Sequence, residues 1–213
     1  VDADVERGLN TAKVTAAVVR ELDAFEWPRG YRYALGGEAE SGSESFSGVG
    51  PAAIVALFGI FAVLVLEFGS FKSTLIVLTV VPIGLVGGLL ALLFTGNSVS
   101  FTASIGLIAL IGIEIKNSIL LVDFTNQLRA HGVALDEAIE RAGETRFVPI
   151  LLTSATAIGG LLPLALQNVG LYSPMAWVII GGLVTSTFLA RLVTPVMYKL
   201  FTPDVEVKPA PFT

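Results

Sequence analysis

Residues 73–113, STLIVLTVVPIGLVGGLLALLFTGNSVSFTASIGLIALIGI, contain no charged side chain in 41 positions. A helix needs about 20 mostly apolar residues to cross the hydrocarbon core of a bilayer. The stretch is therefore long enough for two passes, and the polar residues 95–100 (TGNSVS) favour a turn between them. It predicts two transmembrane helices that are neighbours in the chain.

The same pattern continues on both sides of this stretch. Residues 45–66 carry no charge, and neither do residues 147–190. The second of these runs is interrupted by the polar, uncharged residues 167–174 (QNVGLYSP). Residues 127–146 are polar and include ALDEAIERAGE, which predicts a short helix at the cytoplasmic surface. Five spans are predicted, at about 49–68, 73–94, 101–126, 147–166 and 174–200.

The composition agrees with an all-α polytopic membrane protein. Hydrophobic residues make up 54% of the chain and charged residues 15%, against about 25% in an ordinary soluble domain. The chain has no cysteine, which excludes a disulfide framework and a thiolate metal site. We found no metal-ligand cluster, no nucleophile beside a base and no phosphate-binding loop, so we expect neither an enzyme nor a cofactor. No basic patch indicates nucleic acid as a partner.

Residues 1–49 are the part of the chain that looks soluble. Apolar residues at helical spacing predict a helix over 11–25, and alternation predicts a short strand over 31–35. The Gly/Ser/Glu-rich residues 36–50 are interpreted as a linker. A helix and a strand are about half of a small α/β unit, so we expect this piece to need partners. The chain begins VDADVERG, and we expect it to be the C-terminal part of a longer protein.

The distribution of lysine and arginine predicts the orientation. Cytoplasmic loops of membrane proteins carry an excess of these residues. The loops after the second and fourth predicted spans contain none. The other loops and the tail, residues 202–213, do contain them: Lys72, Arg129, Arg141, Arg146, Lys199 and Lys208. We therefore expect residues 1–49 on the outer side and the tail in the cytoplasm.

Lys116 is the most costly residue of the third span. A lysine at a helix centre costs about 2.5–3.5 kcal/mol on insertion scales. Reaching the cytoplasmic interface would need about 15 Å, which is beyond a lysine side chain. Lys116 must therefore face the protein interior or a wet cavity with a carboxylate partner, in a functional site or in a structural ion pair. Asn117 beside it could hydrogen-bond to another helix.

Further polar residues accompany Lys116. Asp123 lies two turns along the same face, either in a relay with Lys116 or solvated at the interface. Glu114 lies about 200° around the helix from Lys116, so the two cannot pair, and Glu114 needs its own partner or a proton. Arg146 opens the fourth span and Thr153 lies two turns deeper, which fits a topology anchor or a proton path. Buried titratable groups in a bundle indicate ion-coupled transport.

A series of motifs in order resembles the C-terminal half of an RND-family transporter, in its hydrophobe/amphiphile (multidrug) efflux branch. These motifs are LIGIEIKNSILLVDF (110–124), GxxLxEAIxxA (132–142), RxxPILLTS (146–154), GGLLPLA (159–165), PRGYRYALGGE (28–38), VPIGLVGGLLAL (81–92) and VTPVMYKLF (193–201). The resemblance covers essentially the whole chain.

The resemblance implies an inner-membrane homotrimer that exports amphiphiles by proton antiport, with a periplasmic adaptor and an outer-membrane channel as partners. The five spans would be the last five of twelve, and residues 1–49 the end of a periplasmic porter subdomain. The family pairs two aspartates on its fourth span with a lysine, an arginine and a threonine. These three map to Lys116, Arg146 and Thr153, with protons as the coupling ion.

Two other functions stay open. An RND exporter of metal ions or lipids is one, although a metal path would favour methionine or acidic clusters and the chain has only Met175 and Met197. A non-transporting or split membrane module that needs a partner half is the other. The aspartate-bearing fourth span is absent from this sequence, so we expect the rest of the transporter to supply the partner of Lys116.

Overall fold

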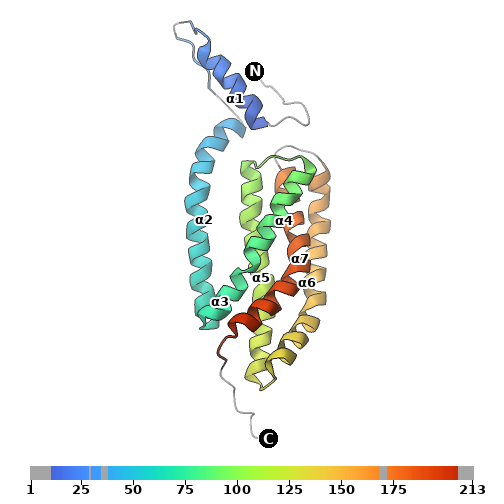
Figure 1. Ribbon diagram of the computed structural model, residues 1–213. Coiled ribbons are helices and arrows are strands. Elements are labelled where there is room, and N and C mark those ends of the chain that lie inside the picture. The colour runs from blue at the N-terminus through green and yellow to red at the C-terminus, as the bar shows by residue number, and fades with distance from the viewer. Residues whose placement is uncertain (1–10, 29, 35–37, 168–171, 206–213) are drawn as a thin grey trace.

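Every secondary-structure element in the described part of the chain is a helix. The computed structural model describes residues 11–28, 30–34, 38–167 and 172–205. Figure 1 shows the helices in chain order: α1 (Thr11–Ala24), α2 (Glu38–Phe68), α3 (Phe71–Leu78), α4 (Val80–Thr95), α5 (Phe101–Ala130), α6 (Leu135–Leu166) and α7 (Ser173–Phe201).

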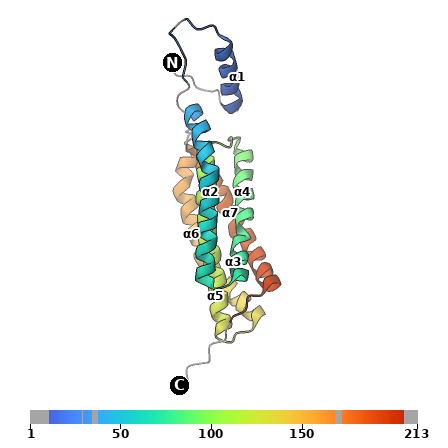
Figure 2. The same ribbon diagram turned by 90° about the vertical axis from the view of Figure 1, so that its left-hand side faces the viewer.

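The five predicted spans are confirmed as five helical segments of sufficient length and apolar character. They are Gly50–Phe68, Phe71–Thr95, Phe101–Ala130, Leu135–Leu166 and Ser173–Phe201. Figure 2 shows that these segments run along one common axis, as expected of helices that cross a bilayer together. We call the end of the bundle near α1 the upper end and the end near the last turn of α7 the lower end (Figure 1).

The second span is broken at Thr79, between α3 and α4. Pro82 has no N–H group to donate to the carbonyl of Leu78, so the helical hydrogen-bond ladder is interrupted there. At the same break, the hydroxyl of Thr79 donates to the carbonyl of Ile76, one turn earlier, at 2.6 Å. Figure 1 shows α3 and α4 meeting at an angle at this break.

The predicted α/β piece at the N-terminus is not supported. Helix α1 is present, but residues 31–34 form no strand, and Leu35 lies outside the described residues. The N–H group of Tyr31 instead donates to the carbonyl of Pro28 at 3.0 Å, which closes a turn. A strand needs a neighbouring strand for its backbone hydrogen bonds, and the described residues provide none.

Aromatic packing holds the segment after α1. The ring of Trp27 lies 5.0 Å from that of Phe25 and 5.8 Å from that of Tyr33. The hydroxyl of Tyr33 donates a hydrogen bond to the carboxylate of Asp23 on α1. This hydrogen bond, with a smaller contribution from desolvation, raises the pKa of Tyr33 above its usual value. The segment therefore folds back along α1 through side chains.

Two helices are longer than the sequence pattern indicated. Helix α2 begins at Glu38 and so includes most of the segment interpreted as a linker. Helix α6 joins the expected surface helix and the fourth span in one element of 32 residues. Neither helix stops where its polarity changes, because the residues between the two parts include good helix formers such as alanine and glutamate.

The tightest packing joins α4 to α7. A Cβ atom added to Gly87 would lie 2.8 Å from the carbonyl oxygen of Gly181, and one added to Gly181 would lie 2.7 Å from that of Gly87. This close approach is typical of glycine-mediated helix contact in membranes. By contrast, Gly159 and Gly160 on α6 have no atom within 4 Å of an added Cβ.

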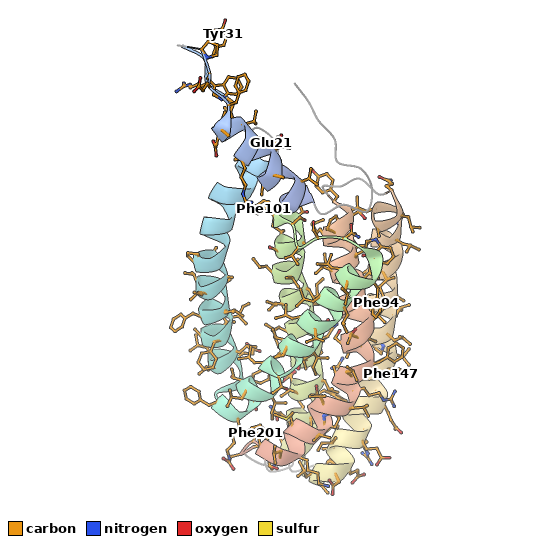
Figure 3. All side chains as sticks on the ribbon, turned by 45° about the horizontal axis from the view of Figure 1, so that its top comes forward. Glu21, Tyr31, Phe94, Phe101, Phe147 and Phe201 are labelled. Atoms are coloured by element: carbon orange, nitrogen blue, oxygen red, sulfur yellow. The ribbon has the colours of Figure 1, made fainter. Side chains whose placement is uncertain are left out.

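Burial is uneven across the bundle. In the most apolar window of each span, 44% of the residues are buried for Phe71–Thr95 and for Ser173–Phe201, but 6% for Gly50–Phe68 and for Leu135–Leu166. Figure 3 shows side chains projecting from α2 away from the bundle. Helices α4, α5 and α7 therefore form the core, and α2 and α6 present broad surfaces outward.

Candidate functional site

Helix α5 carries its two central charged residues on different faces. The side chain of Glu114 is buried, with 2% of its surface exposed, whereas that of Lys116 is exposed. An α-helix turns by about 100° per residue, so two positions separate the side chains by about 200°. The placement agrees with the expectation that the two residues form no pair on their own helix.

Glu114 lies where α4, α5 and α7 meet. A Cβ atom added to Gly84 on α4 would lie 3.1 Å from Cγ of Glu114, so the absence of a side chain at Gly84 leaves the space that Glu114 occupies. From α7, the hydroxyl of Ser186 donates a hydrogen bond to Oε1 of Glu114. The expected need of Glu114 for its own partner is thus met by a neutral hydroxyl.

A cavity of about 50 Å³ lies beside Glu114, between α5, α6 and α7. Two of its hydroxyls, those of Ser118 and Thr194, are buried and have no hydrogen-bond partner among the described residues. The wall combines apolar residues such as Phe147 and Ile150 with a set of polar ones: Glu114, Asn117, Ser118, Ser186, Thr187, Arg191 and Thr194. The cavity wall is thus mostly apolar, with a group of polar side chains on it.

Two arginines from neighbouring helices lie close to this region. The guanidinium of Arg191 lies 4.1 Å from the ring centroid of Phe147, and that of Arg146 lies 4.7 Å from the ring centroid of Phe124. Nε of Arg146 is buried and has no hydrogen-bond partner in the described structure. Cation–π contact at these distances is favourable, but it leaves the guanidinium donors available for other partners.

The three residues expected to form the relay are not hydrogen-bonded to one another in the described structure. Lys116 forms no hydrogen bond or ion pair with any described residue. The hydroxyl of Thr153 is exposed and donates to the carbonyl of Ile150 at 2.8 Å, within its own helix. No hydrogen bond joins Lys116, Arg146 and Thr153 in the described part of the chain.

The two other expected residues have different surroundings. Asp123 is partly exposed and accepts a hydrogen bond from Nε2 of Gln127 at 2.7 Å, one turn further along α5. Asn117 lines the cavity beside Glu114. The structure therefore associates Asn117 with Glu114 and leaves Asp123 near the lower end of α5.

A polar network closes the lower end of the bundle. The hydroxyl of Tyr198 donates to Oδ1 of Asn126 at 2.5 Å, and Arg129 donates to Tyr198 at 3.4 Å and to the carbonyl of Pro203 at 2.5 Å. These contacts tie α5 to α7 and to the residues that follow α7.

Ion pairs extend this network to other helices. Lys199 pairs with Asp136 of α6 at 2.8 Å, and Lys72 pairs with Asp204 at 2.8 Å. The hydrogen bond from Lys72 and the charge of its ammonium group lower the pKa of Asp204 below its usual range.

The hydroxyl residues of α7 were not recognised from the sequence. Ser186, Thr187 and Thr194 all line the cavity, and Thr187 donates to Oγ of Ser154 on α6 at 2.9 Å. The signal was the run TSTFLARLVT over residues 185–194, which places four hydroxyls and one arginine inside a predicted span. Hydroxyls in a span commonly bond to their own backbone, so sequence alone does not show which of them line a cavity.

The chemistry available to this site is proton binding and hydrogen bonding. It combines a buried carboxyl, several hydroxyls, an amide and two guanidinium groups. No group of three or more His, Cys, Asp or Glu residues that could hold a metal ion occurs among the described residues.

Comparison with known proteins gives one family. The family model described as AcrB/AcrD/AcrF matches residues 1–202. The swarming motility protein SwrC of Bacillus subtilis is 33% identical over 204 residues, covering 94% of this chain and 19% of its own length. The cobalt-zinc-cadmium resistance protein CzcA of Cupriavidus metallidurans is 36% identical over 176 residues, covering 81% of this chain and 17% of its own.

A multidrug relative and a solved structure agree with this result. The multidrug resistance protein MdtC of Pectobacterium carotovorum is 33% identical over 205 residues, covering 94% of this chain and 20% of its own. The crystal structure of a heavy metal efflux pump matches with a TM-score of 0.70 and 28% identity, over 91% of this chain and 20% of that one. The chain spans about a fifth of the length of the relatives it matches.

Proposed function

Because the chain belongs to the AcrB/AcrD/AcrF family of RND-superfamily efflux transporters, we propose that it forms part of the membrane domain of a proton-driven exporter. The observation that carries this proposal is Lys116. It lies at the middle of the 30-residue helix α5, where a charge is costly, and it has no partner in the described structure. A charge kept at that depth indicates a functional contact with an acidic group from elsewhere in the transporter.

The proposed relay joins Lys116 to the aspartates of a further span, with Arg146 and Thr153 on the proton path. When those aspartates bind protons, Lys116 loses its counter-charge and moves, and the surrounding helices move with it. Arg146 fits this role because its buried Nε has no partner in the described residues. The exposed hydroxyl of Thr153 is free to accept a hydrogen bond from another helix.

The relay is tested by Lys116→Ala in the complete transporter that contains these residues. In proteoliposomes with a proton gradient as the only energy source, export should fall to the level of empty liposomes. Lys72→Ala is the matched control, because Lys72 lies at the lower end of the bundle in an exposed ion pair, and it should export normally. Export that survives Lys116→Ala would show that the relay assignment is wrong.

For the exported compounds, we propose amphiphiles as the substrate class. The support is the motif KNSILLVDF around Lys116, which resembles the amphiphile branch, together with the similarity to the multidrug resistance protein MdtC. A metal cation is the second candidate, favoured by the similarity to CzcA and to the structure of a heavy metal efflux pump.

The two substrate classes are separated by expressing the complete transporter in a host that lacks its own exporters. Growth in detergents, dyes and lipophilic antibiotics is compared with growth in zinc, cobalt and cadmium salts. Lys116→Ala serves as the inactive control in both series. Resistance to the first group alone supports amphiphile export, and resistance to the metals alone overturns it in favour of cation export.

We further propose a location in the bacterial inner membrane, with the upper end periplasmic and the lower end cytoplasmic. A homotrimer, a periplasmic adaptor and an outer-membrane channel complete the proposed assembly. The chain has no cysteine, so single introduced cysteines report the orientation directly. In intact spheroplasts, an impermeant thiol reagent should label Val99→Cys and leave Glu140→Cys unlabelled. The reverse result would invert the proposed orientation.

A further inference from the structure

We propose that Glu114 is a second proton-binding group of the membrane domain, loaded through the cavity between α5, α6 and α7 and separate from the Lys116 face. This inference rests on the proposed function, since a proton-binding group matters here only in a proton-driven transporter. Three observations carry it: the lack of an ion-pair partner for Glu114 among the described residues, its position at a helix junction, and the unpaired hydroxyls beside it.

The first observation concerns the charges around Glu114. Helix α4, which packs against it through Gly84, has no titratable residue. Helix α7 contributes Ser186 as the hydrogen-bond donor and Arg191 on the cavity wall, and the guanidinium of Arg191 lies on the ring of Phe147. None of the ion pairs in the described structure involves Glu114.

The remaining charges lie on α5 itself and on α6. Lys116 lies on the opposite face of α5, and Asp123 bonds to Gln127 further along that helix. The guanidinium of Arg146 on α6 lies over Phe124. An ionised carboxylate buried at membrane depth without a cation is costly. Glu114 is therefore stable with a proton bound in this arrangement, and loses it when water or a cation reaches it.

The second observation is the position of Glu114 between three helices. Its side chain fills the space left by Gly84 and accepts a hydrogen bond from the hydroxyl of Ser186. The Gly87–Gly181 contact between α4 and α7 lies about one turn away along each helix and leaves no room for further approach. A change in the charge of Glu114 therefore acts on the junction of α4, α5 and α7, the most buried helices of the bundle.

The third observation is the path to Glu114. Ser118 lies one helical turn below Glu114 on α5, and Thr194 lies about two turns below Ser186 on α7. Both hydroxyls are more than nine-tenths buried, line the same cavity and have no partner in the described structure. A water molecule needs about 10–15 Å³ of such space and two to four polar partners. The cavity, at about 50 Å³, is large enough for a short chain of waters between these hydroxyls.

The proton step balances without any other reactant. A carboxylate oxygen of Glu114 accepts a proton from a hydronium ion delivered through the cavity waters, which leaves a water molecule. When the helices rearrange, the same oxygen gives the proton to a water molecule, which leaves as hydronium. The hydroxyls of Ser118 and Thr194 hold the chain of waters in place by hydrogen bonds and undergo no net change in protonation. The two hydroxyls of this route lie below Glu114, toward the lower end of the bundle, whereas Lys116 is exposed on the outside of the bundle.

The test is infrared difference spectroscopy of the complete transporter in lipid nanodiscs, with a pH step as the perturbation. A protonated carboxyl has a carbonyl-stretch band that carboxylates lack. We expect a band that titrates with pH, that is lost in Glu114→Gln and that persists in Asp123→Asn. We also expect it to persist in Lys116→Met, since the two residues lie on separate faces.

A double variant tests the path. Ser118→Ala with Thr194→Val removes both unpaired hydroxyls and should slow the deuterium exchange of the Glu114 band by about tenfold. Val63→Ala with Val148→Ala is the control, because both side chains are exposed and away from the cavity, and it should exchange like the parent. Exchange unchanged in the double variant would overturn the path through the cavity.

Other results would overturn the proton-binding role itself. A Glu114 band of constant intensity at every pH would show a permanently protonated structural group. A band that responds to sodium at constant pH would show a cation site instead. If Glu114→Gln fails to fold, Ser186→Ala takes its place, and an unshifted titration midpoint in that variant would count against the assignment. Export that survives Lys116→Ala refutes the proposed relay but leaves each of these readouts interpretable.

Discussion

The contact between α4 and α7 yields a stability prediction. In Gly87→Ala, the new Cβ atom would lie 2.8 Å from the carbonyl oxygen of Gly181 and would also meet the side chain of Thr185. Ordinary contact begins at 3.4 Å, and Cβ of Thr185, which no rotamer change can move, would lie at 2.5 Å. The two helices must therefore separate by about 0.9 Å. Overpacking of this kind typically costs about 1–3 kcal/mol.

A matched control separates packing from helix propensity. Gly159→Ala on α6 adds the same methyl group where no atom lies within 4 Å. Alanine is favoured over glycine in a helix by up to about 1 kcal/mol, so this variant should be equal to the parent or more stable. The same gain offsets part of the loss in Gly87→Ala, which leaves a net destabilisation of up to about 2 kcal/mol.

The assay is SDS-induced unfolding in mixed micelles, followed by the fluorescence of Trp177 on α7 with Trp27 replaced by phenylalanine. The unfolding midpoint should fall for Gly87→Ala and stay or rise for Gly159→Ala. If Gly87→Ala matches the parent, the α4–α7 contact is not as close as the structure indicates. If both variants lose stability equally, a general effect of alanine is responsible and the packing argument fails.

Two further predictions concern the lower end of the bundle. The folded-state pKa of Asp204 is lowered by Lys72, so their ion pair is complete above the unfolded pKa of about 3.9 and is lost as pH falls through the lower folded value. Carbon-13 NMR of labelled aspartate should show this lowered midpoint, and Lys72→Gln should return it to the usual range. Tyr198→Phe removes the hydrogen bond to Asn126 and the one from Arg129 while the ring stays in place, and should destabilise the protein by about 1 kcal/mol, measured as a shift in thermal unfolding. An unchanged melting temperature would show that these two hydrogen bonds contribute no net stability.

The membrane part of the fold followed directly from the sequence. Charge-free runs and their polar breaks located all five spans, since a bilayer imposes a minimum length on every apolar segment. The opposed faces of Glu114 and Lys116 followed from helix geometry alone. The start of α2 and the continuity of α6 did not, because local polarity does not decide where a helix begins or stops.

Tertiary contacts set the limit of the site prediction. The sequence drew attention to Glu114 because a carboxyl in a span is costly, but its partner Ser186 is 72 residues away and no local pattern connects them. The strand expected over 31–35 had the right alternation, but strand pairing is decided by a neighbour that a single segment does not reveal. The relay partners of Lys116 stay a prediction, because the resemblance places them on a span outside this sequence.

The attachment of α2 has a mechanical consequence. Ile60, Leu64 and Phe68 pack into the core near α3, whereas residues 54–59 above them are exposed. The helix has 31 residues and is about 46 Å long. Helix α2 is therefore attached to the other helices of the described structure through its lower part. A sideways force applied near α1 therefore reaches the bundle through these lower contacts with α3 and α5, close to the break at Thr79.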